Sequence, residues 1–249
     1  MTGNHGRVDE CGRAYAGSQL QIQIYVNRRS EELSRGVLRA LPSLASLKAR
    51  LTWVSPIEAE KFAEYQDRAF LAAVGLEHLA PALSNFWPRR GPVWDALAAV
   101  EIPGAPERNG VILVEAKSYP GEIYGDGCGA SDPSSLEQIG AALSQTKRWL
   151  GVAEDVDWTG PLYQSANRLA HLFFFRRERV CVPAWLVNIY FLRDPRRPTR
   201  IEEWEEALPQ VKEKLGLTGV DIPDTASLFL KARDRRELIG PTDSEAGDG

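Results

Sequence analysis

The sequence predicts an α/β protein, because strand-like and helix-like segments alternate along most of the chain. Two apolar runs, at residues 110–119 and 184–192, have the length and composition of buried strands. Between them, residues 135–150 and 161–177 carry apolar side chains three and four positions apart, the spacing of amphipathic helices. The 249 residues, of which 43% are hydrophobic and 26% charged, suffice for one domain with additions around its core.

Strict alternation of apolar and polar side chains from Leu20 to Val26 predicts a half-buried strand near the N-terminus. Ser30 then caps a predicted helix that has two glutamates in its first turn. Residues 93–100 are extended and apolar, and a turn joins them to the strand at 110–119. The same rules predict a strand at 50–54, helices at 57–74 and 76–83, and a late helix at 201–215.

Composition and charge limit the surroundings and partners that we expect. The N-terminal residues contain no apolar signal region, and no apolar stretch approaches the roughly 18 residues of a membrane span, so we expect a soluble, cytoplasmic protein with no membrane partner. The three cysteines, Cys11, Cys128 and Cys181, lack the spacing of zinc sites or disulfide frameworks. A formal net charge of -4 excludes a surface covered in basic residues, so nucleic acid would have to meet a local basic patch.

Two opposite charges leave the apolar strand at 110–119 side by side. Side chains alternate between the faces of a strand, so Glu115 and Lys117 share one face. Burying both costs several kcal/mol unless they are paired, bound to a metal or opened to a cleft. On the preceding strand, Asp95 is the only charged residue. The three residues are therefore either a candidate site or, in the simpler interpretation, an ion pair beside a turn-capping acid.

The order of elements resembles the PD-(D/E)XK nuclease superfamily, the restriction-endonuclease-like fold, in a bacterial-type member. In that family an acid on one strand faces an acid-x-lysine triplet on its hairpin neighbour, and these positions match Asp95, Glu115 and Lys117. The family's Pro-Asp pair is interrupted here, because Pro92 lies three residues before Asp95. The resemblance implies a mixed central sheet flanked by helices in α-β-β-α-α-β order, with an N-terminal strand and helix and a C-terminal helix added.

The resemblance also divides the chain into five parts. It covers a core at about residues 55–195, preceded by a strand-helix-strand addition at 18–54. A helical extension at 196–240 follows the core. We expect the polar segment 1–17 to be mobile and the tail at 241–249 to be disordered.

Metal-dependent phosphodiester hydrolysis is the activity that the resemblance implies. Two carboxylates that hold Mg²⁺, or Mn²⁺, would stabilise the negative charge that develops on the phosphoryl oxygens. Asp95 and Glu115 would be these ligands, with the backbone carbonyl of Ala116 a third. Lys117 would orient or deprotonate the attacking water, or stabilise the developing charge, and the sequence leaves these roles open. A further acid is expected from the first helix: Glu64 is the candidate, and Glu58 and Asp67 are its rivals.

Nucleic acid is the expected partner, DNA in preference to RNA, and the oligomeric state is open, a homodimer included. Basic side chains cluster near the predicted core and could follow a phosphate backbone. On the helix at 135–150, we expect substrate contacts from Gln138, Gln145, Lys147 and Arg148.

Two other functions are consistent with the sequence. A catalytically inactive domain of this fold would serve as a nucleic-acid-binding or protein-interaction module and need no divalent metal. A nucleotide-binding enzyme would instead use the glycine-rich loop Gly125–Gly129 to hold phosphate. The spacing disfavours the second alternative, because several residues separate the glycines from the next helix, whose N-terminus should face the phosphate.

Overall fold

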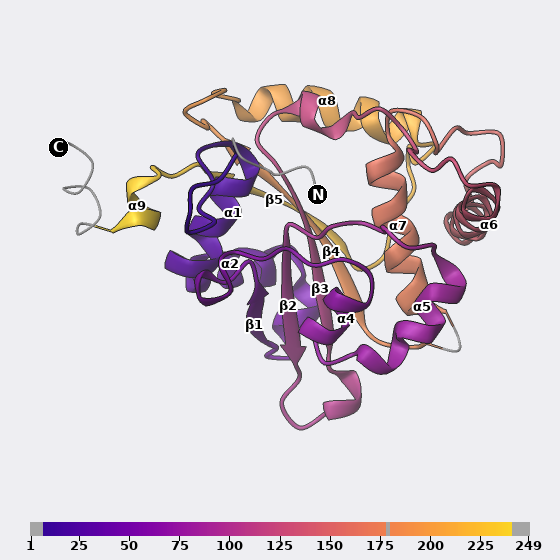
Figure 1. Cartoon of the computed structure of the whole chain (residues 1–249), viewed down its shortest axis with the longest axis horizontal. Coiled ribbons are helices and arrows are strands. Elements are labelled where there is room, and N and C mark those ends of the chain that lie inside the picture. The colour runs from indigo at the N-terminus through magenta and orange to yellow at the C-terminus, as the bar shows by residue number, and fades with distance from the viewer. Residues whose placement is uncertain (1–6, 178–179, 241–249) are drawn as a thin grey trace.

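A five-stranded mixed sheet flanked by helices forms the centre of the computed structural model, which describes residues 7–177 and 180–240 (Figure 1). The strands lie side by side in chain order, β1 to β5. The first three pair antiparallel, and β4 and β5 continue the sheet in parallel. Their bounds are Arg50–Ser55 for β1, Ala96–Glu101 for β2, Gly110–Lys117 for β3, Ala184–Leu192 for β4 and Thr225–Lys231 for β5.

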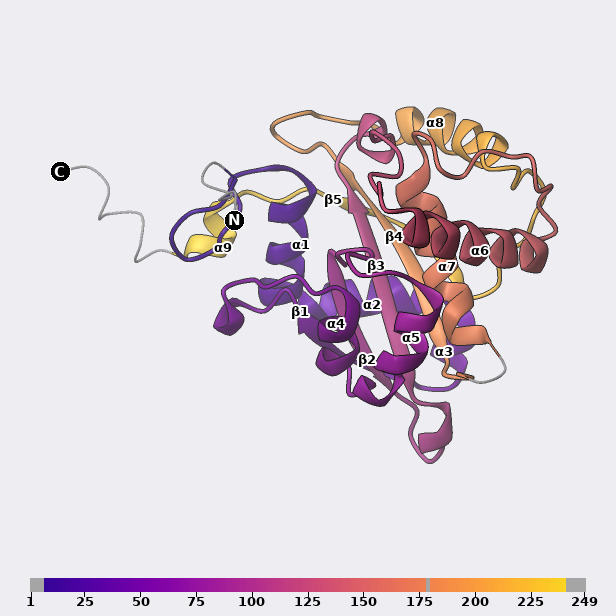
Figure 2. The ribbon, with the colours of Figure 1, turned by 45° about the vertical axis from the view of Figure 1, so that its right-hand side comes forward.

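Helices cover both faces of this sheet. The described helices are α1 (Gly17–Arg28), α2 (Ser30–Ala40), α3 (Pro42–Ser46), α4 (Asp67–Ala73), α5 (Ala80–Phe86), α6 (Pro133–Leu150), α7 (Tyr163–Arg176), α8 (Ile201–Lys214) and α9 (Arg236–Ile239). Side chains of α1, α2 and α3 pack on one face, and those of α4 to α8 pack on the other. Figure 2 shows α6 and α7 on the same side of the sheet, with α8 at its upper end. No helix in the described ranges is long and apolar enough to cross a membrane.

The alternation of β3 decides which face carries the candidate charges. Ile112 and Val114 belong to the core beneath α1 to α3, whereas Val111 and Leu113 belong to the core beneath α4 to α8. Glu115 lies on the same face of β3 as Val111 and Leu113, because side chains two residues apart in a strand share a face. It therefore projects toward the α7 side. The predicted strand, hairpin turn, strand, two helices and strand from residue 93 to 192 are confirmed, although individual ends shift by a few residues.

The predicted N-terminal strand is wrong, because residues 17–28 form helix α1. Every side chain from Leu20 to Val26 is buried, so the alternation of apolar and polar residues does not separate an inner from an outer face. Gln21 exchanges hydrogen bonds with the backbone of Arg233, and Gln23 exchanges them with the backbone of Gly12 and Ala14. Glutamine is a good helix former, and these bonds satisfy its amide in the interior.

The other differences concern the flanks of the core. Residues 57–74 do not form one helix: a 3₁₀ turn at Glu58–Glu60 and α4 are separated by Lys61 and Phe62, whose φ angles of 51° and 57° break helical geometry. Strand β1, which the prediction places before the core, belongs to the central sheet, and residues 225–231, which it places in a helical extension, form strand β5 of the same sheet. Residues 7–16, expected to be mobile, pack against α1 and fully bury Ala14. The tail at 241–249 lies outside the described residues.

Candidate active site

Asp95 and Glu115 meet where β2 and β3 pair. Ala96 pairs with Val114, so one step further along the antiparallel ladder Asp95 lies opposite Glu115. The Asp95 Oδ2 atom accepts a hydrogen bond of 2.7 Å from the Ala116 amide. The structure thus brings Asp95 to the neighbouring strand, as the sequence predicts.

Two cations hold the Glu115 carboxylate. Its Oε1 atom lies 2.5 Å from Lys117 Nζ, and its Oε2 atom lies 2.6 Å from Arg168 Nε on α7. Burial alone would raise the pKa of Glu115, but Arg168 and Lys117 together hold that pKa below its usual value. Glu115 is therefore ionised while only 7% of its surface is exposed.

Asp95 has the opposite electrostatic character. Burial, followed by repulsion from Glu115, raises the pKa of Asp95 to about 8, against the opposing attraction of Lys117. The carboxyl group consequently keeps its proton near neutral pH until further positive charge reaches it. Two facing carboxylates, one charged and one protonated, are a pair that a cation would bring to full ionisation.

Lys117 connects the carboxylates to solvent. Its Nζ atom also donates a hydrogen bond of 3.3 Å to Gln164 Oε1 on α7. Burial would lower the pKa of this ammonium, but Glu115 and Asp95 reverse that effect and raise the pKa above its usual value. Lys117 therefore carries its proton throughout the neutral range, at the border of a cavity of about 720 Å³.

Glu64 is the only one of the three rival acids that is electrostatically coupled to this cluster. Burial and the negative charge of Glu115 raise the pKa of Glu64, and Glu64 in turn raises that of Asp95. Glu64 accepts a hydrogen bond of 3.2 Å from Gln19. Its rivals are engaged elsewhere, since Glu58 pairs with Arg28 and Asp67 accepts two backbone amides. Glu64 lies between two helical segments and not on a first helix.

The residues expected to hold substrate on α6 contact other parts of the protein. Gln138 donates to the Ser84 carbonyl at 2.7 Å, and Arg148 forms an ion pair with Glu154. The prediction for Lys147 is corrected: this residue is only 7% exposed, and its ammonium donates to the carbonyls of Glu154 and Val156 at 2.8 and 2.6 Å instead of facing a substrate. Gln145 is half-buried on the same helix.

Sequence reasoning missed two residues on α7 that complete the cluster. Arg168 contacts Glu115 and also donates a hydrogen bond of 2.9 Å to the Val93 carbonyl. Its guanidinium carbon lies 5.0 Å from the centre of the Trp94 ring. It therefore ties the segment that leads into Asp95 to the acid on β3. Gln164, which binds Lys117, lies four residues earlier, one turn along the same helix face. This i, i+4 spacing of Gln164 and Arg168 on one face of the helix is the signal that could have found them.

The glycine-rich loop Gly125–Gly129 is bound to the protein itself. The Gly125 amide donates to the Pro161 carbonyl at 2.9 Å, and the Cys128 amide donates to the Thr159 carbonyl at 2.8 Å. The Asp132 side chain caps the N-terminus of the following helix through the Ser135 amide. These contacts use the donors that a phosphate-binding loop would offer, which disfavours the nucleotide-binding alternative.

Asp95 and Glu115 offer the kind of oxygen donors that Mg²⁺ requires. Within residues 7–177 and 180–240, no group of three or more His, Cys, Asp or Glu side chains is arranged to hold a metal ion. Mg²⁺, however, is commonly held by one or two carboxylates together with waters and substrate phosphates. Asp95 and Glu115 fit that description, because they are hard oxygen donors facing each other on adjacent strands.

Compared with protein-family models, with curated proteins and with solved structures, the chain matches none of them.

Proposed function

We propose that this chain is a metal-dependent nuclease with a restriction-endonuclease-like core. The observation that carries the proposal is the convergence of Asp95, Glu115 and Lys117 on one face of the β2–β3 pair, next to a cavity. The antiparallel β2–β3 pair, the two following helices and the parallel strand β4 support the same assignment.

Asp95 and Glu115 would hold Mg²⁺ or Mn²⁺, with the Ala116 carbonyl and Glu64 as neighbouring oxygen donors. The metal would supply charge stabilisation to the phosphoryl oxygens of a phosphodiester. Arg168 keeps Glu115 ionised and oriented, and it also holds the Val93 carbonyl just before Asp95. Arg168, on α7, thereby fixes the positions of both carboxylates.

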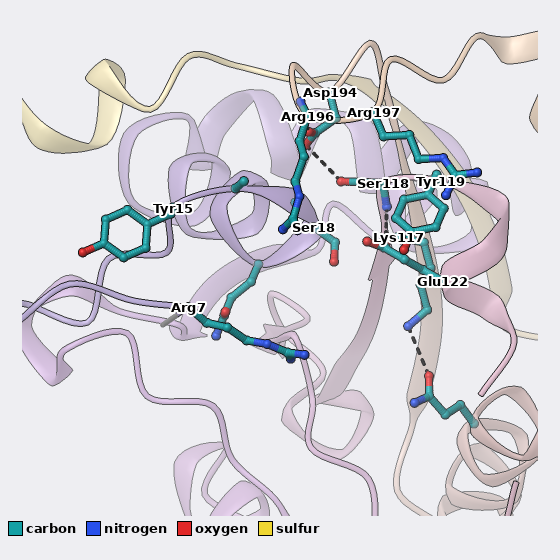
Figure 3. A pocket seen from close by; sticks show the side chains of 14 residues that line it. Arg7, Tyr15, Ser18, Lys117, Ser118, Tyr119, Glu122, Asp194, Arg196 and Arg197 are labelled. Carbon is teal, nitrogen blue, oxygen red and sulfur yellow. Dashed lines mark hydrogen bonds between the residues drawn. The ribbon is translucent and has the colours of Figure 1, made fainter. Parts of the chain in front are cut away.

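Lys117 would act as a cation in this reaction. Because its pKa is raised, the ammonium cannot accept a proton from water at neutral pH. Of the three roles open to it, orienting the attacking water and stabilising developing charge are favoured over deprotonation. The hydrogen bond from Lys117 to Gln164 holds it toward the cavity (Figure 3).

The test compares the wild type with Asp95→Asn and Lys117→Met on single-stranded, double-stranded and structured DNA and RNA. With Mg²⁺ or Mn²⁺, each substitution should lower the cleavage rate by about 10²-fold or more. The matched controls are Asp155→Asn and Lys212→Met, which change an exposed acid and an exposed lysine far from the cluster. Equal cleavage by all five proteins, or cleavage by none of them, would reject the proposal.

One observation favours the alternative of a catalytically inactive binding module. Both oxygens of Glu115 already contact cations of the protein, so the cluster is neutralised without a metal. Calorimetric titration with Mn²⁺ separates the two functions. If the protein is a nuclease, Asp95→Asn should lower its affinity for Mn²⁺. If it is a binding module, the wild type and Asp95→Asn should give the same titration.

A further inference from the structure

A cavity of about 720 Å³ opens beyond Lys117. The N-terminal segment and the start of α1 form one wall, and the residues after β3 and after β4 form the other (Figure 3). Its volume lies in the range of pockets that hold small ligands, about 300–1,000 Å³, and is too small to enclose a duplex. The residues that give it charge are Arg7, Lys117, Glu122, Asp194, Arg196 and Arg197.

The two acids of the cavity accept hydrogen bonds from residues that line it. Asp194 is 1% exposed, and it accepts hydrogen bonds from the Ser118 hydroxyl at 3.1 Å and from the Arg196 amide at 3.0 Å. Glu122 accepts the Ser118 amide at 2.6 Å. Burial raises the pKa of Glu122, which reduces its negative charge further. Neither carboxylate is therefore available to neutralise the arginines.

The three arginines have no carboxylate partner among the described residues. Arg7, Arg196 and Arg197 form no ion pair there, although many other arginines of the described chain do. The Arg197 guanidinium lies 4.1 Å from the centre of the Tyr119 ring, which orients it without satisfying its charge. Figure 3 shows the side chains of Arg7 and Arg196 extending into the hollow between the two walls.

This charge pattern indicates an anionic ligand with several phosphates. Guanidinium groups bind phosphate oxygens through paired N–H donors, and exposed arginines that lack partners are free to do so. Lys117 belongs to both the cavity and the carboxylate cluster, so an occupant of the cavity reaches the proposed reacting groups. A flexible phosphate chain can enter a space of this size, whereas a rigid duplex cannot.

We propose that this arginine cavity, lined by Arg7, Arg196 and Arg197, binds the phosphates of a single nucleic-acid strand and leads it past Lys117 to Asp95 and Glu115. The inference rests on the proposed nuclease function and adds to it the class of substrate. The arginines would contact phosphates and not bases, so the binding should be independent of sequence and should weaken as salt rises. A duplex would have to separate its strands before one of them entered.

The test measures binding without chemistry. Full-length Asp95→Asn protein in EDTA is titrated into a labelled single strand of about 12 nucleotides and, separately, into the matching blunt duplex, with fluorescence anisotropy as the readout. The single strand should bind at least about tenfold more tightly. Arg196→Gln with Arg197→Gln should raise the dissociation constant about tenfold and reduce the slope of log K against log salt by about 1.4.

Arg39→Gln with Arg68→Gln is the matched control, because it removes the same charge from exposed arginines of α2 and α4. Arg196→Lys keeps the charge, and its binding should lie between those of the wild type and Arg196→Gln. Inorganic phosphate and a mononucleotide should compete only at concentrations far above that of the strand. Equal affinity for duplex and single strand, equal effects of the two double substitutions, or tight binding of phosphate alone would overturn the inference.

The outcome is independent of the cleavage test. If no substrate is cleaved but the strand binds through Arg196 and Arg197, the nuclease proposal fails and the cavity assignment stands. If cleavage depends on Asp95 and Lys117 but is insensitive to the arginines, the nuclease proposal stands and the cavity assignment fails.

Discussion

Two lysines on the same side of the sheet, buried Lys147 and half-buried Lys117, have different surroundings. Lys147 donates to two backbone carbonyls and lies 5.8 Å from the centre of the Trp158 ring. Lys117 contacts the side chains of Glu115 and Gln164 and borders the cavity. The partners of Lys147 are fixed parts of a turn, whereas those of Lys117 are side chains that can exchange one partner for another. Burial of a charge therefore indicates function only where its partners leave room for a ligand.

Paired substitutions give the strongest test of this comparison. Lys117→Met should lower cleavage by about 10²-fold or more, and because it removes one of the two cations that hold Glu115, it should also lower the melting temperature. Lys147→Met should affect stability alone: it leaves two carbonyls without a donor, which lowers the free energy of unfolding by about 1–3 kcal/mol, and the folded fraction should cleave at the wild-type rate. Thermal melts and single-turnover cleavage of both variants measure the two effects. Equal cleavage rates for Lys117→Met and Lys147→Met would contradict the proposed difference between the two lysines.

Arg168 tests whether the cluster depends on support from α7. Arg168→Met removes one of the two cations of a buried carboxylate, so the free energy of unfolding should fall by about 3 kcal/mol. The exposed ion pair of Arg148 with Glu154 is the control, and Arg148→Met should cost less than about 1 kcal/mol. Urea denaturation provides both values. Arg168→Lys, which keeps the charge, should recover part of the loss, and equal losses for Arg168→Met and Arg148→Met would contradict the role.

The pH dependence of stability tests the protonation of Asp95. The folded protein keeps the Asp95 proton up to about pH 8, whereas the unfolded chain releases it near its ordinary pKa of 3.8. The stability that this proton contributes is complete below about pH 4 and is lost as the pH rises through 8. In EDTA, the melting temperature of the wild type should therefore fall relative to Asp95→Asn between pH 5 and 8, with Asp155→Asn as control.

Added Mn²⁺ should reverse that loss in the wild type and in Asp155→Asn. Binding of a cation releases the Asp95 proton, so the apparent affinity for Mn²⁺ should rise with pH up to about 8. A metal affinity that is flat across this range would separate Asp95 from the metal site.

The strands and helices that the sequence predicts correctly are those whose burial follows their own periodicity. β3 and β4 are mainly apolar runs, and α6 buries one regular stripe. α7 shows the same spacing of apolar residues, although the structure also buries its polar residues Asn167, Arg168 and His171. β5 was missed because its side chains are mostly half-buried, and its parallel pairing with β4 is a contact between distant segments. α1 was mistaken for a strand because tertiary contacts bury its polar residues: Gln21 bonds to Arg233, 212 residues away, and Gln23 bonds to the N-terminal segment at Gly12 and Ala14.

The sequence by itself determined that Glu115 and Lys117 share a face, because alternation within a strand is a local property of the backbone. Only the tertiary structure decided that Asp95 lies beside them and what surrounds all three. Arg168 reaches Glu115 across 53 residues of chain, and the arginine cavity combines Arg7 with the neighbouring Arg196 and Arg197, which no local pattern connects to Arg7. Packing of the elements brings such electrostatic partners together. Because packing joins segments that are far apart in the sequence, their distance in space cannot be inferred from their separation along the chain.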